Sequence, residues 1–281
     1  NMYLRNRPKK LEANKTYNPD NPIIDYGGSV PNSQKQSVNE TLDTYLNYCK
    51  NKDYDNAFNM LTNDCKAYLY NNDINEFKKY ASNVFEKFNN YSYVQNYSNQ
   101  DKVYIYEVTI LNNDILSTGT TGGYEKYQEK ITIIEEDGVK KIANQGYITH
   151  EKLSREAEDD FMRVKVKCKD MSYSRVSYTL EVKNKTDKTI VIADYNAGKE
   201  VTLNIEGEYQ LATNLAIQES IIKPGETKEL EYIFDKFYDS KREDTQINFN
   251  YVRIIPDFDF ELTLEQQKEQ AYKIYSFNIN L

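Results

Sequence analysis

Apolar residues recur at helical spacing after residue 36. From Ser37 to Lys50 they form a single stripe, which predicts an amphipathic helix. Ser37 and Glu40 make an S-x-x-E pattern, so a capping box is expected at the start of this helix. A short second helix is expected near Tyr54–Leu61. A third is expected from an Asp73 cap to Phe88, because its apolar residues again share one side.

The pattern changes to period two after residue 90, which predicts strands at 91–97, 102–111, 124–134 and 139–143. Asp137–Gly138 predicts a tight turn between the last two. The strand at 102–111 is apolar on both sides, and this suggests a sheet with helices over one face. Residues 37–150 are therefore expected to form an α+β domain with a curved antiparallel sheet.

Short alternating strands with turn residues between them fill the chain from 161 to 281. Val164, Val166 and Cys168 alternate at its start, and Pro224–Gly225 suits the centre of a type II turn. This spacing predicts an all-β, immunoglobulin-like sandwich over 161–281. One or two helical turns are expected at 263–271, before the last strand.

Two segments look like connections. Residues 1–36 hold four of the six prolines and are expected to be an extended arm or linker. In residues 151–160, seven of the ten side chains are charged, which predicts a solvated linker with a short connecting helix.

Composition narrows the functional classes. The length of 281 residues suits two domains. The formal net charge of -8 and the isoelectric point near 5.0 argue against nucleic-acid binding, which needs a basic surface. The phosphate-loop, dinucleotide-binding, serine-hydrolase and zincin motifs do not occur, and no cofactor is expected.

The three cysteines are an odd number without a C-x-x-C pair, so neither a metal site nor a disulfide framework is expected. Cys49 and Cys65 fall on neighbouring predicted helices. They form either a bridge or, as is more common, two buried free thiols.

No apolar run reaches the length of a membrane span. The first residue is Asn1, and residues 1–10 resemble the basic flank of a membrane segment. We therefore expect a membrane anchor or signal segment upstream of Asn1; the alternative is a polar tail.

The first domain resembles the cystatin/nuclear-transport-factor-two-like cone fold over residues 37–150. The resemblance lies in the segments 52–61 (KDYDNAFNML), 75–85 (NEFKKYASNVF) and 127–146, which ends on a strand pair with an acidic-glycine turn. Lys140 departs from the pattern, since many members carry tryptophan there. The second domain is similar, through residues 221–234 (IIKPGETKELEYIF), to immunoglobulin-like modules of Gram-positive surface proteins.

This pairing implies an extracytoplasmic protein, secreted or membrane-anchored, of a low-GC Gram-positive bacterium. Cone-fold enzymes need a base inside the cone and a hydroxyl or acid to stabilise an oxyanion. The only histidine, His150, is expected at the surface or in the linker. The alternating acids of 257–261 are expected on a solvated strand face.

Candidate carboxylates on the strands are Glu107, Glu125 and Glu129. Glu107 is expected either as a buried acid or as a residue that lies near a sheet edge or pairs with a lysine. The candidate ligand- or partner-binding residues are Tyr104, Tyr106, Glu107, Tyr124 and Tyr127.

With no catalytic motif, the sequence favours a non-enzymatic binding or scaffold protein that contacts a protein partner at the cell envelope. The alternative is a small-molecule-binding or isomerase/dehydratase-like cone with a buried carboxylate.

Overall fold

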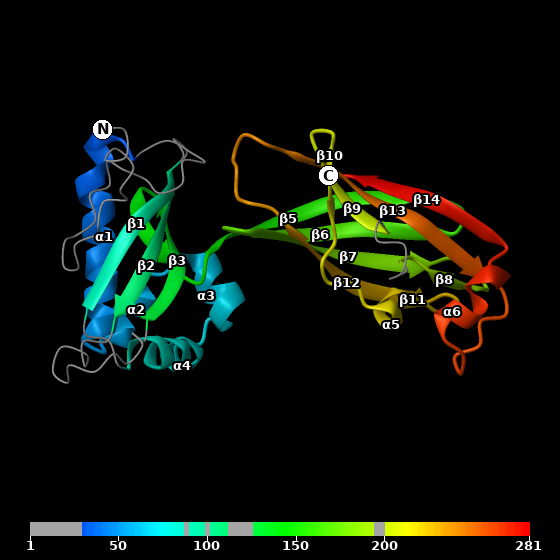
Figure 1. Ribbon diagram of the computed structural model, residues 1–281, viewed down its shortest axis with the longest axis horizontal. Coiled ribbons are helices and arrows are strands. Elements are labelled where there is room, and N and C mark those ends of the chain that lie inside the picture. The colour runs from blue at the N-terminus through cyan, green and yellow to red at the C-terminus, as the bar shows by residue number, and fades with distance from the viewer. Residues whose placement is uncertain (1–29, 87–89, 99–101, 112–125, 194–199) are drawn as a thin grey trace, which may run out of the picture. The chain divides into compact units, whose positions relative to one another are not determined.

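The computed structural model describes residues 30–86, 90–98, 102–111, 126–193 and 200–281 (Figure 1). The chain divides into two units, residues 1–146 and 147–281. The first combines helices with an antiparallel sheet, and the second is built mainly of strands. The expected α+β class is therefore confirmed.

Four helices open the first unit: α1 (Asn32–Lys50), α2 (Tyr54–Asn59), α3 (Asn63–Tyr70) and α4 (Ile74–Phe85). As expected, the apolar stripe of α1 is buried and Asp73 caps α4. The expected capping box at Ser37 is wrong. The helix begins five residues earlier, after Pro31, and the Ser37 hydroxyl donates to the carbonyl of Gln34 instead. Residues 32–36 are thus helix and not arm.

The first unit contains one four-stranded antiparallel sheet in the order β1-β2-β3-β4. Its strands are β1 (Asn90–Ser98), β2 (Val103–Leu111), β3 (Lys126–Glu136) and β4 (Val139–Ala143). The predicted turn joins β3 to β4, with positive φ at both Asp137 and Gly138. This geometry matches the right-handed twist of the strands.

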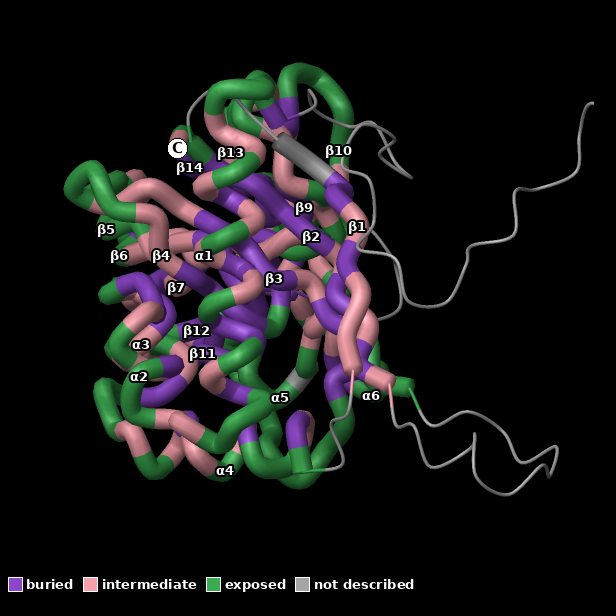
Figure 2. The backbone as a smooth tube through the Cα atoms, turned by 90° about the vertical axis from the view of Figure 1, so that its left-hand side faces the viewer, coloured by how far each residue is buried: buried purple, intermediate pink, exposed green. Residues whose placement is uncertain are grey.

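Helix α1 packs on one face of this sheet, and tyrosine hydroxyls fasten it there. Tyr91 and Tyr93 of β1 donate to Asp43 at 2.9 and 3.2 Å. Tyr106 of β2 donates to Asn39 at 3.3 Å. Tyrosine suits this contact because its ring is buried while its hydroxyl keeps a hydrogen bond. The buried stretches of β2 and β3 are purple in Figure 2.

The second unit contains two sheets. The first has the order β12-β7-β6-β5, with β5 (Tyr147–Glu158), β6 (Met162–Ser172), β7 (Arg175–Asn184) and β12 (Thr227–Asp235). The second has the order β10-β9-β13-β8-β11, with β14 paired to β13. Its strands are β8 (Thr189–Val191), β9 (Val201–Ile205), β10 (Glu208–Leu211), β11 (Ile221–Ile222), β13 (Asp244–Ile255) and β14 (Lys273–Asn280).

One hydrophobic core joins the two sheets, and residues such as Val166 and Leu180 from one sheet and Phe249 and Phe277 from the other contribute to it. Short helices α5 (Ile217–Ser220) and α6 (Leu264–Gln267) lie in the connections. A 3-10 turn follows α6 at Lys268–Gln270, so helical turns occur where they were expected.

Three expectations for the second unit are wrong. Residues 151–158 are neither linker nor helix but part of β5, the outer strand of its sheet. An outer strand of this kind has exposed residues on both sides, and this hides its alternation in the sequence. His150 also lies within β5 and not in a linker; it is on the outer face of the sheet, although only 10% of its side chain is exposed. Residues 257–261 form turns and not a strand, because Gln267 holds the backbone of Asp259.

A β-bulge interrupts the alternation of β6 between Val166 and Cys168. Val164 and Val166 face the core, as expected. After the bulge Lys169 takes the inward place, opposite the buried Tyr178 of β7. Cys168, whose alternation with the valines suggested the same face, lies on the outer face instead.

Candidate functional site

The tyrosines selected from the sequence do not form one exposed cluster. Tyr104 and Tyr106 are only 3% and 0% exposed. They therefore offer no surface to a partner. Tyr127 is 39% exposed, and Tyr124 lies outside the described residues, as does Glu125.

Glu107 forms an ion pair with Lys130 across β2 and β3. Its carboxylate is half-buried and lies on the face of the sheet opposite to Tyr106. Of the two expectations for this residue, the lysine partner is the one that the structure shows.

Among the residues of the first unit that the structure describes, the buried acid is Glu129. Its position on β3, opposite Val108, places it on the same face as Tyr106 and Ile131. Its Oε1 accepts from the hydroxyl of Tyr80 in α4, and its Oε2 accepts from the backbone N–H of Gln145 at 2.8 Å. Burial raises the pKa of Glu129 to about 7, although these two hydrogen bonds act in the opposite direction.

A second group of polar side chains lies near Glu129 and is centred on Asn144. The Asn144 Oδ1 accepts from Tyr70 at 2.8 Å and from the Cys65 thiol, and its Nδ2 donates to Tyr45 at 3.2 Å. Gln145 connects the two groups, since its side chain donates to Tyr70 at 3.0 Å. In this connected set of polar side chains, the Glu129 carboxyl is the group that can hold a proton near neutral pH.

The sequence did not single out Tyr70, Tyr80 or Asn144, because helical spacing alone does not show which hydroxyls meet a carboxylate. Cys49 and Cys65 are both free and buried, so the structure shows no bridge between them. Burial raises the pKa of each thiol to about 12, and both are therefore uncharged and unreactive at neutral pH.

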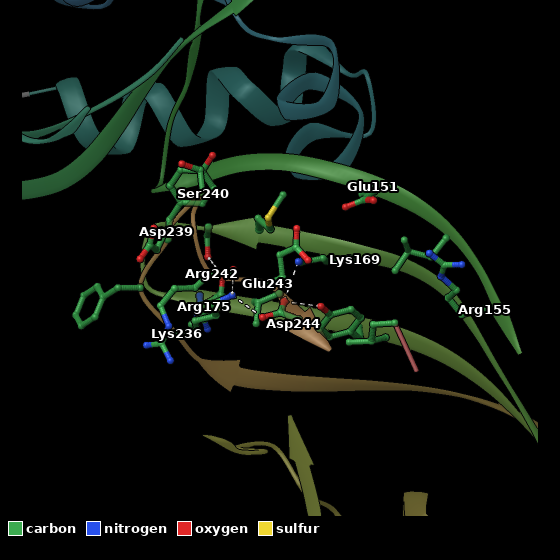
Figure 3. Close-up of a pocket in the computed structure, with 18 residues that line it drawn as sticks. Glu151, Arg155, Lys169, Arg175, Lys236, Asp239, Ser240, Arg242, Glu243 and Asp244 are labelled. Carbon is green, nitrogen blue, oxygen red and sulfur yellow. Dashed lines mark hydrogen bonds and ion pairs between the residues drawn. The ribbon is translucent and has the colours of Figure 1, made fainter. Parts of the chain in front are cut away.

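The second unit has a cavity of about 490 Å³ where β6, β7 and the segment before β13 meet (Figure 3). Asp244 lies beside it with a side chain that is 1% exposed. Lys169 contacts this carboxylate at 2.8 Å, Lys236 forms a second ion pair with it, and the Tyr178 hydroxyl donates to it at 2.5 Å. Burial disfavours the charged carboxylate, but these partners together lower the pKa of Asp244.

The Asp244 cluster depends on the bulge in β6, which turns Lys169 inward. Two lysines and a tyrosine hydroxyl share the single Asp244 carboxylate. The cluster thus fastens β6, β7 and the start of β13 together.

The outer face of the sheet that contains β13 is unusually poor in charge. Strand register places directly paired residues on the same face, so the members of this face follow from the pairing of β10, β9, β13 and β14. Among the positions that this pairing places on the outer face of the described strands, only Arg253 is charged, and Arg253 is itself buried, as are Thr202 and Asn248. We call this surface the uncharged face: Thr202, Asn204, Tyr209, Leu211, Gln246, Asn248, Arg253, Ile274, Asn278 and Asn280.

Apolar side chains protrude from the uncharged face. Tyr209 is 64% exposed, Leu211 42% and Ile274 55%. Between them the polar side chains bond to one another: Gln246 donates to Asn280 at 3.0 Å, and Asn248 donates to Thr202 at 3.4 Å.

The outer face of the other sheet has the opposite character. Its positions on β5, β6, β7 and β12 carry both signs of charge. Arg163 of β6 forms an ion pair with Glu156 of the neighbouring β5, and Lys167 of β6 forms one with Glu229 of β12, across β7. We call this surface the charged face: Lys152, Glu156, Arg163, Lys165, Lys167, Glu181, Lys183, Glu229 and Glu231.

No protein-family model, no curated protein and no solved structure matches this chain. Among the helices that the structure describes, none combines the length and apolarity needed to span a membrane. Function must therefore be inferred from the sites themselves.

Proposed function

We propose that this chain is a non-enzymatic binding or scaffold protein that contacts a protein partner through the uncharged face of its second unit. The observation that carries the proposal is the contrast between the two outer faces of the same unit. Charged residues make up 28% of the chain and populate one face densely, yet one charge occupies the paired positions of the other.

This contrast has the physical character of a docking surface. The cores of protein interfaces are depleted in Lys, Glu and Asp and enriched in tyrosine, because desolvating a charge costs more than desolvating a hydroxyl or an amide. Tyr209 and Ile274 supply apolar contact area on this face, and the exposed Asn278 and Asn280 supply adaptable hydrogen bonds.

Strand β14 adds a second means of contact. It is paired with β13, and after Lys273 it contains no charge and no proline. Outer strands are normally protected by charges or proline, as β5 is by its many charged side chains. An uncharged outer strand can accept an added strand from a partner.

The finer fold and the location belong to the same proposal. The first unit, with helices on one antiparallel sheet, is compatible with a cystatin/nuclear-transport-factor-two-like cone. The two packed sheets of the second unit are compatible with an immunoglobulin-like sandwich. The resemblance in sequence supports an extracytoplasmic location at the envelope of a Gram-positive bacterium, whether secreted or membrane-anchored.

Site-specific photo-crosslinking in the native host tests the docking face. A photoreactive phenylalanine replaces Tyr209 or Ile274, and as a control it replaces the exposed Thr227 on the outer face of β12. The expected result is one envelope protein crosslinked from the first two positions and not from the third. Tyr209→Asp and Ile274→Asp should abolish its capture, whereas Thr227→Asp should not.

Equal crosslinking from all three positions, or capture of a second copy of this chain alone, would overturn the proposal of a distinct partner on this face.

A second candidate function rests on Glu129. A buried carboxylate with a pKa near 7 beside a tyrosine hydroxyl is the arrangement that an isomerase- or dehydratase-like cone uses for proton transfer. Native mass spectrometry of protein purified from its host tests this alternative. A bound small molecule that Glu129→Gln releases and Glu107→Gln retains would favour it. A ligand-free protein would count against it.

A further inference from the structure

Three side chains with metal-binding atoms converge on the outer face of the sheet that carries β5 and β6. They are His150 of β5 and Cys168 and Asp170 of β6, and their donor atoms all lie within 4.8 Å of one another. His150 and Asp170 are direct cross-strand partners. Cys168 is two residues before Asp170 and therefore lies on the same face.

The bulge in β6 creates this grouping. If the alternation of Val164 and Val166 continued, the thiol of Cys168 would enter the core. The extra residue after Val166 turns Cys168 and Asp170 outward, toward His150, while Lys169 turns inward to Asp244. Bulges commonly redirect side chains in this way beside functional sites.

The three donors are already partly oriented. The His150 Nδ1 lies 2.9 Å from the Asp170 Oδ1, and the Tyr147 hydroxyl donates to the same oxygen at 3.1 Å. The imidazole is largely shielded, with 10% of the side chain exposed, and 28% of the Asp170 side chain is exposed. The Tyr147 hydroxyl is not itself a ligand, so its hydrogen bond can hold the Asp170 carboxylate in place around an ion. An ion between the His150 Nδ1 and the Asp170 Oδ1 replaces the hydrogen bond that joins these two atoms.

We propose that His150, Cys168 and Asp170 bind one divalent transition-metal ion of the zinc type. One nitrogen, one sulfur and one oxygen donor suit Zn²⁺, whereas Ca²⁺ and Mg²⁺ prefer oxygen ligands alone. When each donor atom lies about 2.0–2.3 Å from a tetrahedral ion, the donor atoms lie roughly 3.5 Å from one another. Rotation of the three side chains brings their donor atoms, now within 4.8 Å, to this spacing. Binding replaces the thiol proton by the ion, and the proton passes to solvent.

Three protein ligands leave one coordination position open, as in zinc sites where water or a further ligand completes the shell. The site is separate from the uncharged face, because it lies on the other sheet of the unit. The metal site can therefore be confirmed or refuted independently of the proposed docking function.

Co²⁺ and Zn²⁺ titrations of the full chain test the site. Bound Co²⁺ should give a thiolate-to-metal absorption band at one equivalent per chain, and Zn²⁺ should displace it. The chain has a single histidine, so the imidazole resonances seen by NMR report His150 alone. They should shift at the same stoichiometry.

Cys168→Ser should abolish the thiolate band. His150→Gln and Asp170→Asn should each weaken Zn²⁺ binding by about tenfold or more. Glu151→Gln is the matched control, because Glu151 neighbours His150 but lines the cavity on the opposite side of the sheet; it should bind like the wild type. Circular dichroism checks that each variant is folded. If Cys168→Ser does not fold, His150→Gln and Asp170→Asn provide the test.

A thiolate band that survives in Cys168→Ser would assign the metal to another cysteine and overturn the proposal. So would His150 resonances that do not respond to Zn²⁺. Absence of binding together with rapid alkylation of Cys168 that depends on His150 would likewise overturn it, and would show a nucleophile–base pair instead of a metal site.

Discussion

The raised pKa of Glu129 predicts a stability that falls as the pH rises. In the folded chain the pKa is about 7, against an ordinary value of 4.5. A raised folded-state pKa gives stabilisation that is fully present below the unfolded value and is lost as the pH rises through the folded value. At about 1.4 kcal/mol for each unit of difference, the full effect is about 3 kcal/mol.

Glu129→Gln removes this titration while it keeps the size of the side chain and an acceptor for Tyr80. Between about pH 5 and about pH 8, the wild-type free energy of unfolding should lose about 2.5 kcal/mol through Glu129 alone. The variant should lack this component. As the pH rises over this range, the free energy of unfolding of the variant should therefore increase by about 2.5 kcal/mol relative to that of the wild type.

Urea denaturation followed by circular dichroism across this pH range measures the difference directly. Glu107→Gln provides the control, since Glu107 lies on the neighbouring strand, faces the other way and pairs with Lys130. Parallel pH profiles for wild type and Glu129→Gln would refute the reasoning and show that the Glu129 carboxylate keeps an ordinary affinity for protons.

Three further predictions concern the second unit. Asp244→Ala leaves two lysines and a tyrosine without their shared carboxylate, and should lower the free energy of unfolding by about 3 kcal/mol in urea denaturation; a loss below about 1 kcal/mol would contradict the cluster. Asn184→Ala removes an NH2 group whose two N–H donors are shared among the carbonyls of Lys188, Ile222 and Lys223. It should cost about 2 kcal/mol in the same assay, whereas an unchanged midpoint would show that water replaces the amide. Ile274→Asp, at a position that is 55% exposed, should change the free energy of unfolding by no more than about 0.5 kcal/mol, and a larger loss would mean that Ile274 belongs to the fold and not to a docking face.

Periodicity predicted the elements of this protein well where one face of each element is buried. The stripe of α1, the strands β2 to β4 and the turn at Asp137–Gly138 all lie where the apolar pattern places them. In each case burial of one face requires a regular repeat, and a regular repeat can be read from the sequence.

The same reasoning failed where tertiary neighbours decide the outcome. The charges of β5 hid a strand, because an outer strand can be polar on both sides. Glu107 and Glu129 both lie on apolar strands, and the sequence treats them alike. Only the packing of α4, which brings Tyr80 to Glu129, distinguishes the buried acid from the ion-paired one.

The β-bulge in β6 also has a consequence for how this protein tolerates change in evolution. One extra residue determines which face of the sheet each later side chain of the strand, from Cys168 to Ser172, points to. Point substitutions there alter one contact at a time, but deletion of a single residue would exchange the inward and outward sets together. Lys169 would leave Asp244 in the same step in which Cys168 and Asp170 left His150. Lineages of this protein should therefore vary in residue identity along this strand while they keep its length unchanged.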